Sequence, residues 1–242
     1  KGGDSNTAVS ESGTGDDAIA ACTHRANQTA GFSVVTYQGK NDEISNGQHT
    51  KVAHGLGKKP DLIIGKNLAT SRDWFVMSIP QQNDAHMHLN TTAVNVGSDF
   101  TGTWSDSDTT HFVVGNDDLV NEAGANFVAY VFAGIPGYSK VGSYVGNGNA
   151  NGPFIETGFS PSWVMFKRSS GSVASWVIYD NARDPSNPAD RMQIVETPAA
   201  DNVGNEIDWL SNGLKIKGTS GAYNGSSDTY IYMAFGDAFA GT

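Results

Sequence analysis

The sequence predicts an all-β protein, built as two related β-sandwich or jelly-roll-like domains from an internal duplication behind an extended N-terminal arm. Three observations support this fold class. Valine occurs 19 times and leucine 7 times, and β-branched valine suits a pleated strand better than a helix. Short apolar runs alternate with turn pairs such as Asn46-Gly47 and Asn212-Gly213. The chain also repeats itself at spacings of 101 to 107 residues.

The repetition consists of five landmarks that occur twice in the same order. They are TYQG and SYVG from residues 36 and 143, DLIIGKN and SWVMFKR from 61 and 162, Trp74 and Trp176, HFVVG and GLKIK from 111 and 213, and NFVAYVFAG and TYIYMAFGD from 126 and 229. We interpret them as a duplication and predict domains at residues 31–140 and 141–242. The last strand of each half, within 127–132 and 230–235, is too apolar for a sheet edge, so we expect it to be central and buried on both faces.

Residues 1–30 are rich in Gly, Ser, Thr, Asn and Asp, which predicts an arm or linker with one strand-like patch at 18–22. Ordered β structure is expected to begin at Gly31. The arm buries too little apolar surface to fold alone, but its patch could add a strand to the open sheet edge of a neighbouring subunit. This favours a homo-oligomer. The alternative is a flexible arm on a monomer.

Charge and apolar patterning exclude two classes of partner. The net charge is −10, and no cluster of Lys and Arg is present to replace the counterions of a nucleic acid. The longest apolar run, 127–135, is about half of the ~20 residues that a membrane helix needs. Cys22 is the single cysteine, so an intrachain disulfide is impossible.

Three groups of residues are candidate metal or ion sites. His86 and His88 would project from one face of a strand, which suits a transition metal, with His49, His54 or Asp84 as a third ligand. We favour a simpler interpretation, a pair of polar strand residues. The loop at 180–190 carries acids that suit Ca²⁺ or a glycan, but Arg183 and Arg191 favour a salt-bridged, rigid loop. The run 116–118 lacks the spacing of a calcium loop.

The sequence offers no motif for catalysis. A GxSxG elbow is missing, and Cys22 with His24 has nothing nearby to build an oxyanion hole. The glycine-rich stretch at 146–149 is followed by neither a Lys-Ser/Thr pair nor a helix, so it is no phosphate loop. We therefore expect a protein that is not an enzyme and uses no cofactor.

The aromatic residues divide into two groups. Trp74 and Trp176 stand at equivalent positions of the two halves and are expected to pack in the cores. Another group lies among Gly, Ser, Asn and Asp, where exposed aromatics would anchor sugar rings or partner proteins. This predicted binding set is Trp104, Tyr138, Phe154, Trp209 and Tyr223.

Several strings together resemble a family of tandem β-domains, about 100 residues each, found in tail-fibre-like virion proteins of tailed bacteriophages, often marine. The resemblance covers about residues 31–239 and is most specific at IPGYSKVGSYVGNG (135–148) and YDNARDPSNP (179–188). In that family a polar arm follows an earlier repeat, so Lys1-Gly2-Gly3 is expected to follow a further domain. The family supplies no catalytic residues to carry over.

The resemblance implies a structural or adhesive module of a phage particle that contacts the host. Because phage appendages of this kind are commonly threefold, it also implies that the homo-oligomer is a trimer. Its expected location is the virion, and its expected partners are other virion proteins and a host-surface glycan or receptor. A capsid- or tail-decorating protein without a receptor role is the alternative. A depolymerase of surface polysaccharide is a third, less favoured class.

Overall fold

The computed structural model describes residues 5–13, 18–40, 49–78, 86–94, 106–204 and 206–237. Strands dominate these residues, and the single helix among them is one turn long. The chain divides into two compact units, Lys1–His88 with Val96–Ala133 and Leu89–Asn95 with Gly134–Thr242. The predicted boundary after residue 140 differs from this division, because the first strand of the second unit already begins at Ser139.

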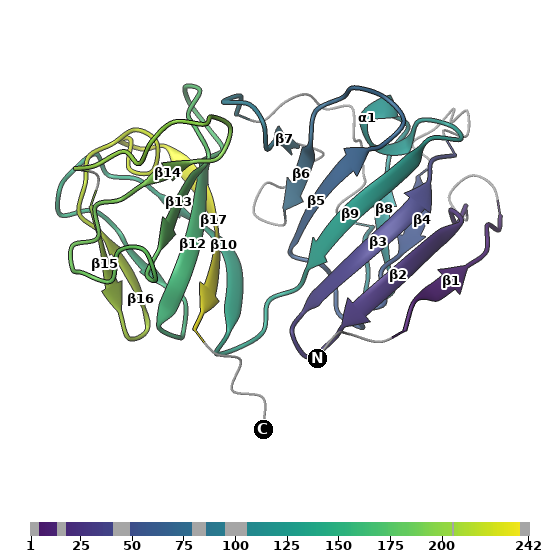
Figure 1. Cartoon of the computed structure of the whole chain (residues 1–242), viewed down its shortest axis with the longest axis horizontal. Helices are drawn as coiled ribbons and strands as arrows, with labels where there is room; N and C mark the ends of the chain where they lie inside the picture. The colour runs from purple at the N-terminus through teal and green to yellow at the C-terminus, as the bar shows by residue number, and fades with distance from the viewer. Residues whose placement is uncertain are drawn as a thin grey trace. The chain divides into compact units, whose positions relative to one another are not determined.

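The first unit is built on a seven-stranded antiparallel sheet (Figure 1). In spatial order its strands are β1 (Thr7–Val9), β2 (Cys22–Asn27), β3 (Phe32–Gln38), β9 (Asn126–Phe132), β5 (Leu62–Asn67), β6 (Phe75–Ser78) and β7 (Met87–His88). The inner face is apolar because alternate residues of each strand point to it. Val35, Tyr37 and Phe127 are among the buried residues there.

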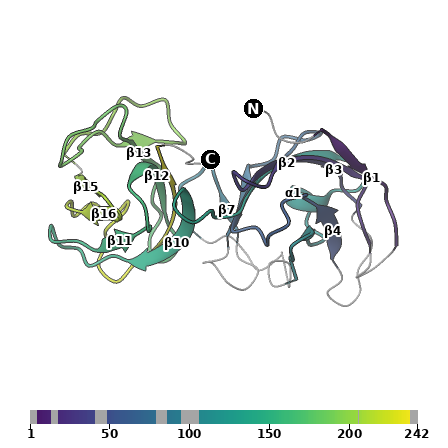
Figure 2. The ribbon, with the colours of Figure 1, turned by 90° about the horizontal axis from the view of Figure 1, so that it is seen from below.

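A second layer closes the core of the first unit. It consists of the pair β4 (Thr50–Ala53) and β8 (His111–Val114), with the helix α1 (Asp118–Asn121) after β8. Figure 2 shows β4 and α1 on one side of β2 and β3. Val52, Phe112 and Val114 from this layer join the core, so the unit is a two-layered β-sandwich, as predicted.

The N-terminal segment corrects the prediction of an arm. Strand β2 pairs with β3 over six residues and β1 pairs with β2, so ordered β structure begins before Gly31. Ala18, Ala20 and Cys22 are buried in their own chain's unit. Strand β2 was not predicted because its buried side chains, Cys22 and Ala26, are small, whereas the sequence pattern relied on large apolar residues. Backbone hydrogen bonds to β3 hold β2. The patch at 18–22 has its own partners within the unit, because Ala18 and Ala20 bond to the Lys51 backbone and Ile19 bonds to that of Ser12.

The second unit repeats this architecture. Its larger sheet runs β10 (Ser139–Val145), β17 (Thr229–Gly236), β12 (Pro161–Arg168), β13 (Val177–Asp180) and β14 (Gln193–Ile194). Its smaller sheet runs β11 (Phe154–Glu156), β16 (Gly213–Ile216) and β15 (Ile207–Leu210). Val164, Phe166, Tyr179 and Leu214 lie in its core. Neither unit holds a described helix long and apolar enough to span a membrane.

Five strands of the first unit's larger sheet match the larger sheet of the second unit in order. The order β3-β9-β5-β6-β7 in the first unit corresponds to β10-β17-β12-β13-β14 in the second. The registers agree with the sequence landmarks: Lys66 pairs with Val128, and Lys167, 101 residues later, pairs with Ile231, 103 residues later. This agreement supports the predicted duplication.

The central positions of the two apolar strands were predicted correctly, but their burial on both faces holds for only one of them. β9 and β17 are each central in their sheet. β17 is buried on both faces for most of its length, whereas β9 is fully buried only on its inner face. Trp176 is buried, but Trp74 is half-exposed and stacks on Tyr130, with ring centroids 6.4 Å apart.

Candidate functional site

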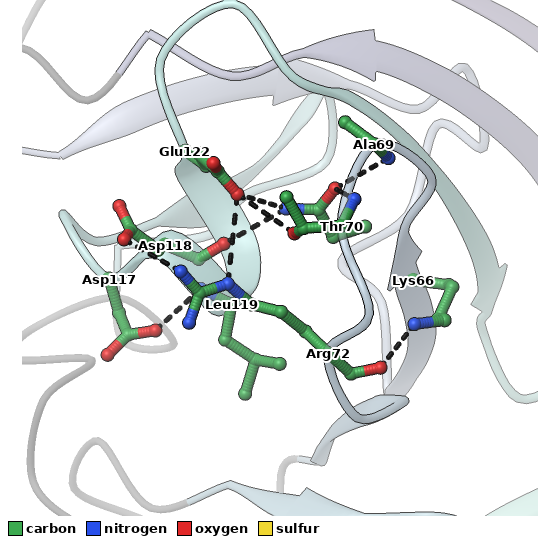
Figure 3. Close-up of polar contacts among 9 residues, drawn as sticks. Lys66, Ala69, Thr70, Arg72, Asp117, Asp118, Leu119 and Glu122 are labelled. Atoms are coloured by element: carbon green, nitrogen blue, oxygen red, sulfur yellow. Dashed lines mark hydrogen bonds and ion pairs between the residues drawn. The ribbon is translucent and has the colours of Figure 1, made fainter.

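The best-organised group of charged side chains lies at one end of the first unit, where β5 leaves the sheet near α1. The helix begins at an N-cap, Asp117, whose carboxylate accepts a hydrogen bond from the Leu119 amide at 2.6 Å. The opposing loop, 68–74, joins β5 to β6 and carries Arg72. Its shape is fixed by the Lys66 ammonium, which donates to the Arg72 carbonyl (Figure 3).

Arg72 points at two carboxylates of the helix segment (Figure 3). Its guanidinium lies 2.8 Å from the Asp118 carboxylate and 3.7 Å from that of Glu122. Glu122 also accepts hydrogen bonds from Asn67 Nδ2 at 2.7 Å and Thr70 Oγ1 at 3.1 Å. We call these five residues, Asn67, Thr70, Arg72, Asp118 and Glu122, the α1 cluster.

A surface hollow of about 410 Å³ lies beside the α1 cluster. We call it the α1 hollow; its lining residues are Ser71, Arg72, Asp73, His86, His88, Asp117 and Leu119. All but Leu119 are polar or charged. The hollow therefore offers donors and acceptors rather than an apolar surface.

Histidines form one wall of the hollow. The rings of His86 and His88 lie 5.2 Å apart, and His88 Nδ1 is 3.0 Å from the Asp73 carboxylate. Burial, together with the neighbouring His88, lowers the pKa of His86 to about 4, so this ring is neutral at pH 7. Among the described residues, no group of three or more His, Cys, Asp or Glu side chains is placed to hold a metal ion.

The structure places the predicted binding set differently from the expectation of exposed loop aromatics. Trp104 lies outside the described residues. Phe154 is 45% exposed on β11, and Tyr138 is half-buried, with its ring 5.8 Å from that of Phe235. Trp209 and Tyr223 are buried, so the prediction is wrong for both.

Local contacts explain these two corrections. The Trp209 indole donates to the Asp184 carbonyl at 3.2 Å, and its backbone exchanges two hydrogen bonds with the Asn187 side chain. Tyr223 packs against Phe166 and Tyr179, with centroids 6.4 and 6.0 Å away. Polar neighbours in the sequence suggested solvent exposure. Instead, groups distant in the chain satisfy the Trp209 indole by hydrogen bonds and cover the Tyr223 ring by aromatic packing.

The loop at 180–190 is held by other contacts than the predicted ones. Arg183 pairs with Asp201 outside the loop, at 2.8 Å. Burial alone would raise the pKa of Asp184, but hydrogen bonds from the Asp190 and Arg191 amides and the Ser186 hydroxyl outweigh it and lower that pKa. Backbone amides, rather than loop arginines, therefore stabilise the central acid.

Sequence reasoning missed the α1 hollow because its members come from separate segments. Arg72 and Asp118 are 46 residues apart in the chain. The available signal was weak: two short charged runs, 71–73 and 116–118, each follow an apolar strand. The second run was examined only as a calcium loop.

The fold and these contacts define an all-β protein of two β-sandwich units, with the polar α1 hollow on the first unit. The chain belongs to a family described as a domain of unknown function (DUF7483), whose model matches residues 4–238. The match includes the N-terminal segment and both units. Comparisons with curated proteins and with solved structures found no match.

Proposed function

We propose that this protein is a non-enzymatic, structural and adhesive module of a bacteriophage particle, and that it binds a host-surface glycan in the α1 hollow. The resemblance of residues 31–239 to tail-fibre-like virion proteins supports the particle location. The observation that carries the binding role is the position of Arg72. The carboxylates of Asp118 and Glu122 hold its guanidinium at the edge of the α1 hollow.

Glycan recognition fits this arrangement on chemical grounds. A sugar presents hydroxyl groups that both donate and accept, so its site needs donors and acceptors at fixed positions. Arg72 supplies donors, Asp73 and Asp117 supply acceptors, and the Ser71 hydroxyl supplies both. Because Arg72 is already paired with Asp118, less side-chain entropy is lost when a ligand binds.

Binding to purified bacterial polysaccharides tests the proposal. We would immobilise lipopolysaccharide and capsular polysaccharide from a panel of bacteria and measure binding of the full chain. Arg72→Ala should weaken binding at least tenfold. Arg183→Ala is the matched control, because the two arginine side chains are 38% and 39% exposed and each forms an ion pair at 2.8 Å.

Three results would count against the proposal. Equal loss in both variants would show a nonspecific charge effect. Absence of binding across the panel, with normal host adsorption but unstable particles when the gene is deleted, would favour the decorating role. Release of reducing ends from a polysaccharide would favour a depolymerase.

A further inference from the structure

Strand β10 forms an edge of the larger sheet of the second unit. It pairs with β17 through seven register positions, and no other described strand pairs with it. On its outer side Ser139, the first residue, exchanges backbone hydrogen bonds with Ile135. Its counterpart in the first unit, β3, is paired on both sides, with β9 and with β2. The second unit therefore has an open edge at the place where the first unit carries an added strand.

The chain has no room to fill this edge with a β2-like strand of its own. β9 ends at Phe132 and β10 begins at Ser139, so residues 133–138 are the only connection. Strand β2 alone takes six residues, and a further turn joins it to β3. The short link cannot provide both.

The exposed backbone groups of β10 belong to alternate residues. The Gly146 amide donates to the Asp228 carbonyl of the β17 side, which assigns Gly142 and Tyr144 to the hydrogen-bonded positions facing β17. The N–H and C=O groups of Val141, Ser143 and Val145 consequently point away from the sheet. Ser143 is exposed, and Val145 is 58% exposed.

This edge carries little of the protection that natural edges show. Proteins usually shorten their edge strands or add charges and prolines. The other edge strands described are two to four residues long, whereas β10 has seven. It contains no proline, and its one charged residue, Lys140, donates through its ammonium to the Glu156 carbonyl at 2.8 Å.

We propose that β10 is a self-association surface, which pairs antiparallel with β10 of a second copy of this chain about a two-fold axis at Gly142. In this register Val141 faces Ser143 of the second copy, and Lys140 faces Tyr144. No like charges oppose each other. The pairing spans residues 140–144, because the outward N–H and C=O groups of Ser139 already bond to Ile135 of the same chain. Both strands are identical, so the contact is closed and needs no second surface.

The core of the second unit is complete without this contact. The Tyr232 ring lies over Gly142, where an added Cβ would approach it to 2.7 Å, and Tyr232 is 4% exposed. In the first unit, β2 contributes buried Cys22 and Ala26 next to β3. The second copy would thus add mainly backbone hydrogen bonds, and the monomer should fold alone and associate reversibly.

Sedimentation equilibrium of the full chain tests the proposal. We expect a monomer–dimer equilibrium, with slower amide hydrogen exchange of residues 141–145 at high protein concentration than at low. Ser143→Pro removes an outward N–H, and Val145→Lys adds a charge at the edge; each should raise the dimer dissociation constant at least tenfold. Val173→Lys is the control, because Val173 is 65% exposed in a loop.

Several outcomes would overturn the proposal. They are a monomeric mass at every concentration tested, a trimeric mass, or a dimer that both edge variants leave intact. Thermal unfolding of the variants distinguishes lost association from lost folding, since proline is tolerated at an edge whose N–H faces solvent.

Discussion

Asn121 and Asn224 make two equivalent hydrogen bonds in the two units. Asn121 accepts from the Lys40 amide at 3.0 Å and donates to the Gly115 carbonyl at 2.8 Å. Asn224 accepts from the Asn147 amide at 2.9 Å and donates to the Gly218 carbonyl at 2.8 Å. Both asparagines are fully buried. Asn121 joins the residues after β3 to the segment before β9, and Asn224 joins those after β10 to the segment before β17.

A tyrosine accompanies each asparagine. The Tyr37 hydroxyl donates to the Val120 carbonyl at 2.6 Å, and the Tyr144 hydroxyl donates to the Tyr223 carbonyl at 2.6 Å. Tyr37 stacks on Phe127 and Tyr144 on Tyr230, with centroids 4.9 and 5.1 Å apart. Side-chain contacts of this detail, added to the shared strand order, are what a duplication would leave.

The first prediction concerns these asparagines. Asn121→Ala and Asn224→Ala should each lower the free energy of unfolding by about 2–3 kcal/mol, because each leaves buried backbone groups without a partner. Chemical denaturation measures the loss. The exposed Asn151 is the control, since its described hydrogen bonds use the backbone. If either buried variant is as stable as Asn151→Ala, the asparagine does not hold its unit together.

A pair of glycines should be equally sensitive. A Cβ at Gly39 would lie 2.2 Å from the Glu122 carbonyl oxygen, and one at Gly146 would lie 2.3 Å from that of Gly225. Gly39→Ala and Gly146→Ala should each cost about 1–3 kcal/mol of stability through overpacking. Thermal melts would show the effect. Gly221→Ala, whose Cβ would lie 3.7 Å from the Arg168 guanidinium, should melt like the natural chain.

Acid should weaken the first unit through His54. This ring is fully buried, and its Nδ1 accepts a hydrogen bond from the Leu56 amide at 3.1 Å. Burial is the main reason that its pKa falls from 6.5 to about 4. The unfolded chain therefore binds a proton more readily than the folded chain, and His54 contributes stability above pH 6.5 that is lost as the pH falls to about 4.

Comparison with a non-titrating variant isolates this contribution. Between pH 7 and pH 4 the natural chain should lose about 3 kcal/mol more unfolding free energy than His54→Gln, at about 1.4 kcal/mol for each pKa unit. Denaturant titrations at several pH values measure the difference. Parallel pH dependence of the two chains would refute the assignment.

Trp209 and Phe154 should behave oppositely. Trp209→Ala removes a buried indole and should cost about 3–5 kcal/mol. Phe154→Ala removes an exposed ring and should change stability by less than about 1 kcal/mol. Denaturation midpoints of the two variants decide the matter. A host-adsorption defect in Trp209→Ala would therefore reflect unfolding of the second unit, unless its midpoint proves normal.

Local patterns in the sequence predicted most of the strands. Apolar alternation between Gly and Asn turns is a short-range property, so it identified β3, β8 and β17 without knowledge of the fold. The repeated landmarks also predicted the matching registers. If two strands pair in the first unit, adding each strand's landmark spacing to its residue numbers gives the pair in the second unit. β2 escaped because its inward residues are small, and their burial depends on β3 lying beside them.

The candidate site depended on tertiary structure. Arg72 meets Asp118 and Glu122 only because β5 and the segment after β8 end at the same edge of the first unit, and one sequence does not state which loops share an edge. The burial of Trp209 and Tyr223 was decided in the same way, by partners such as Asp184 and Tyr179 that lie 25 and 44 residues away along the chain. Strand formation follows from short-range patterning, whereas side-chain exposure is set by whichever distant segments pack against it.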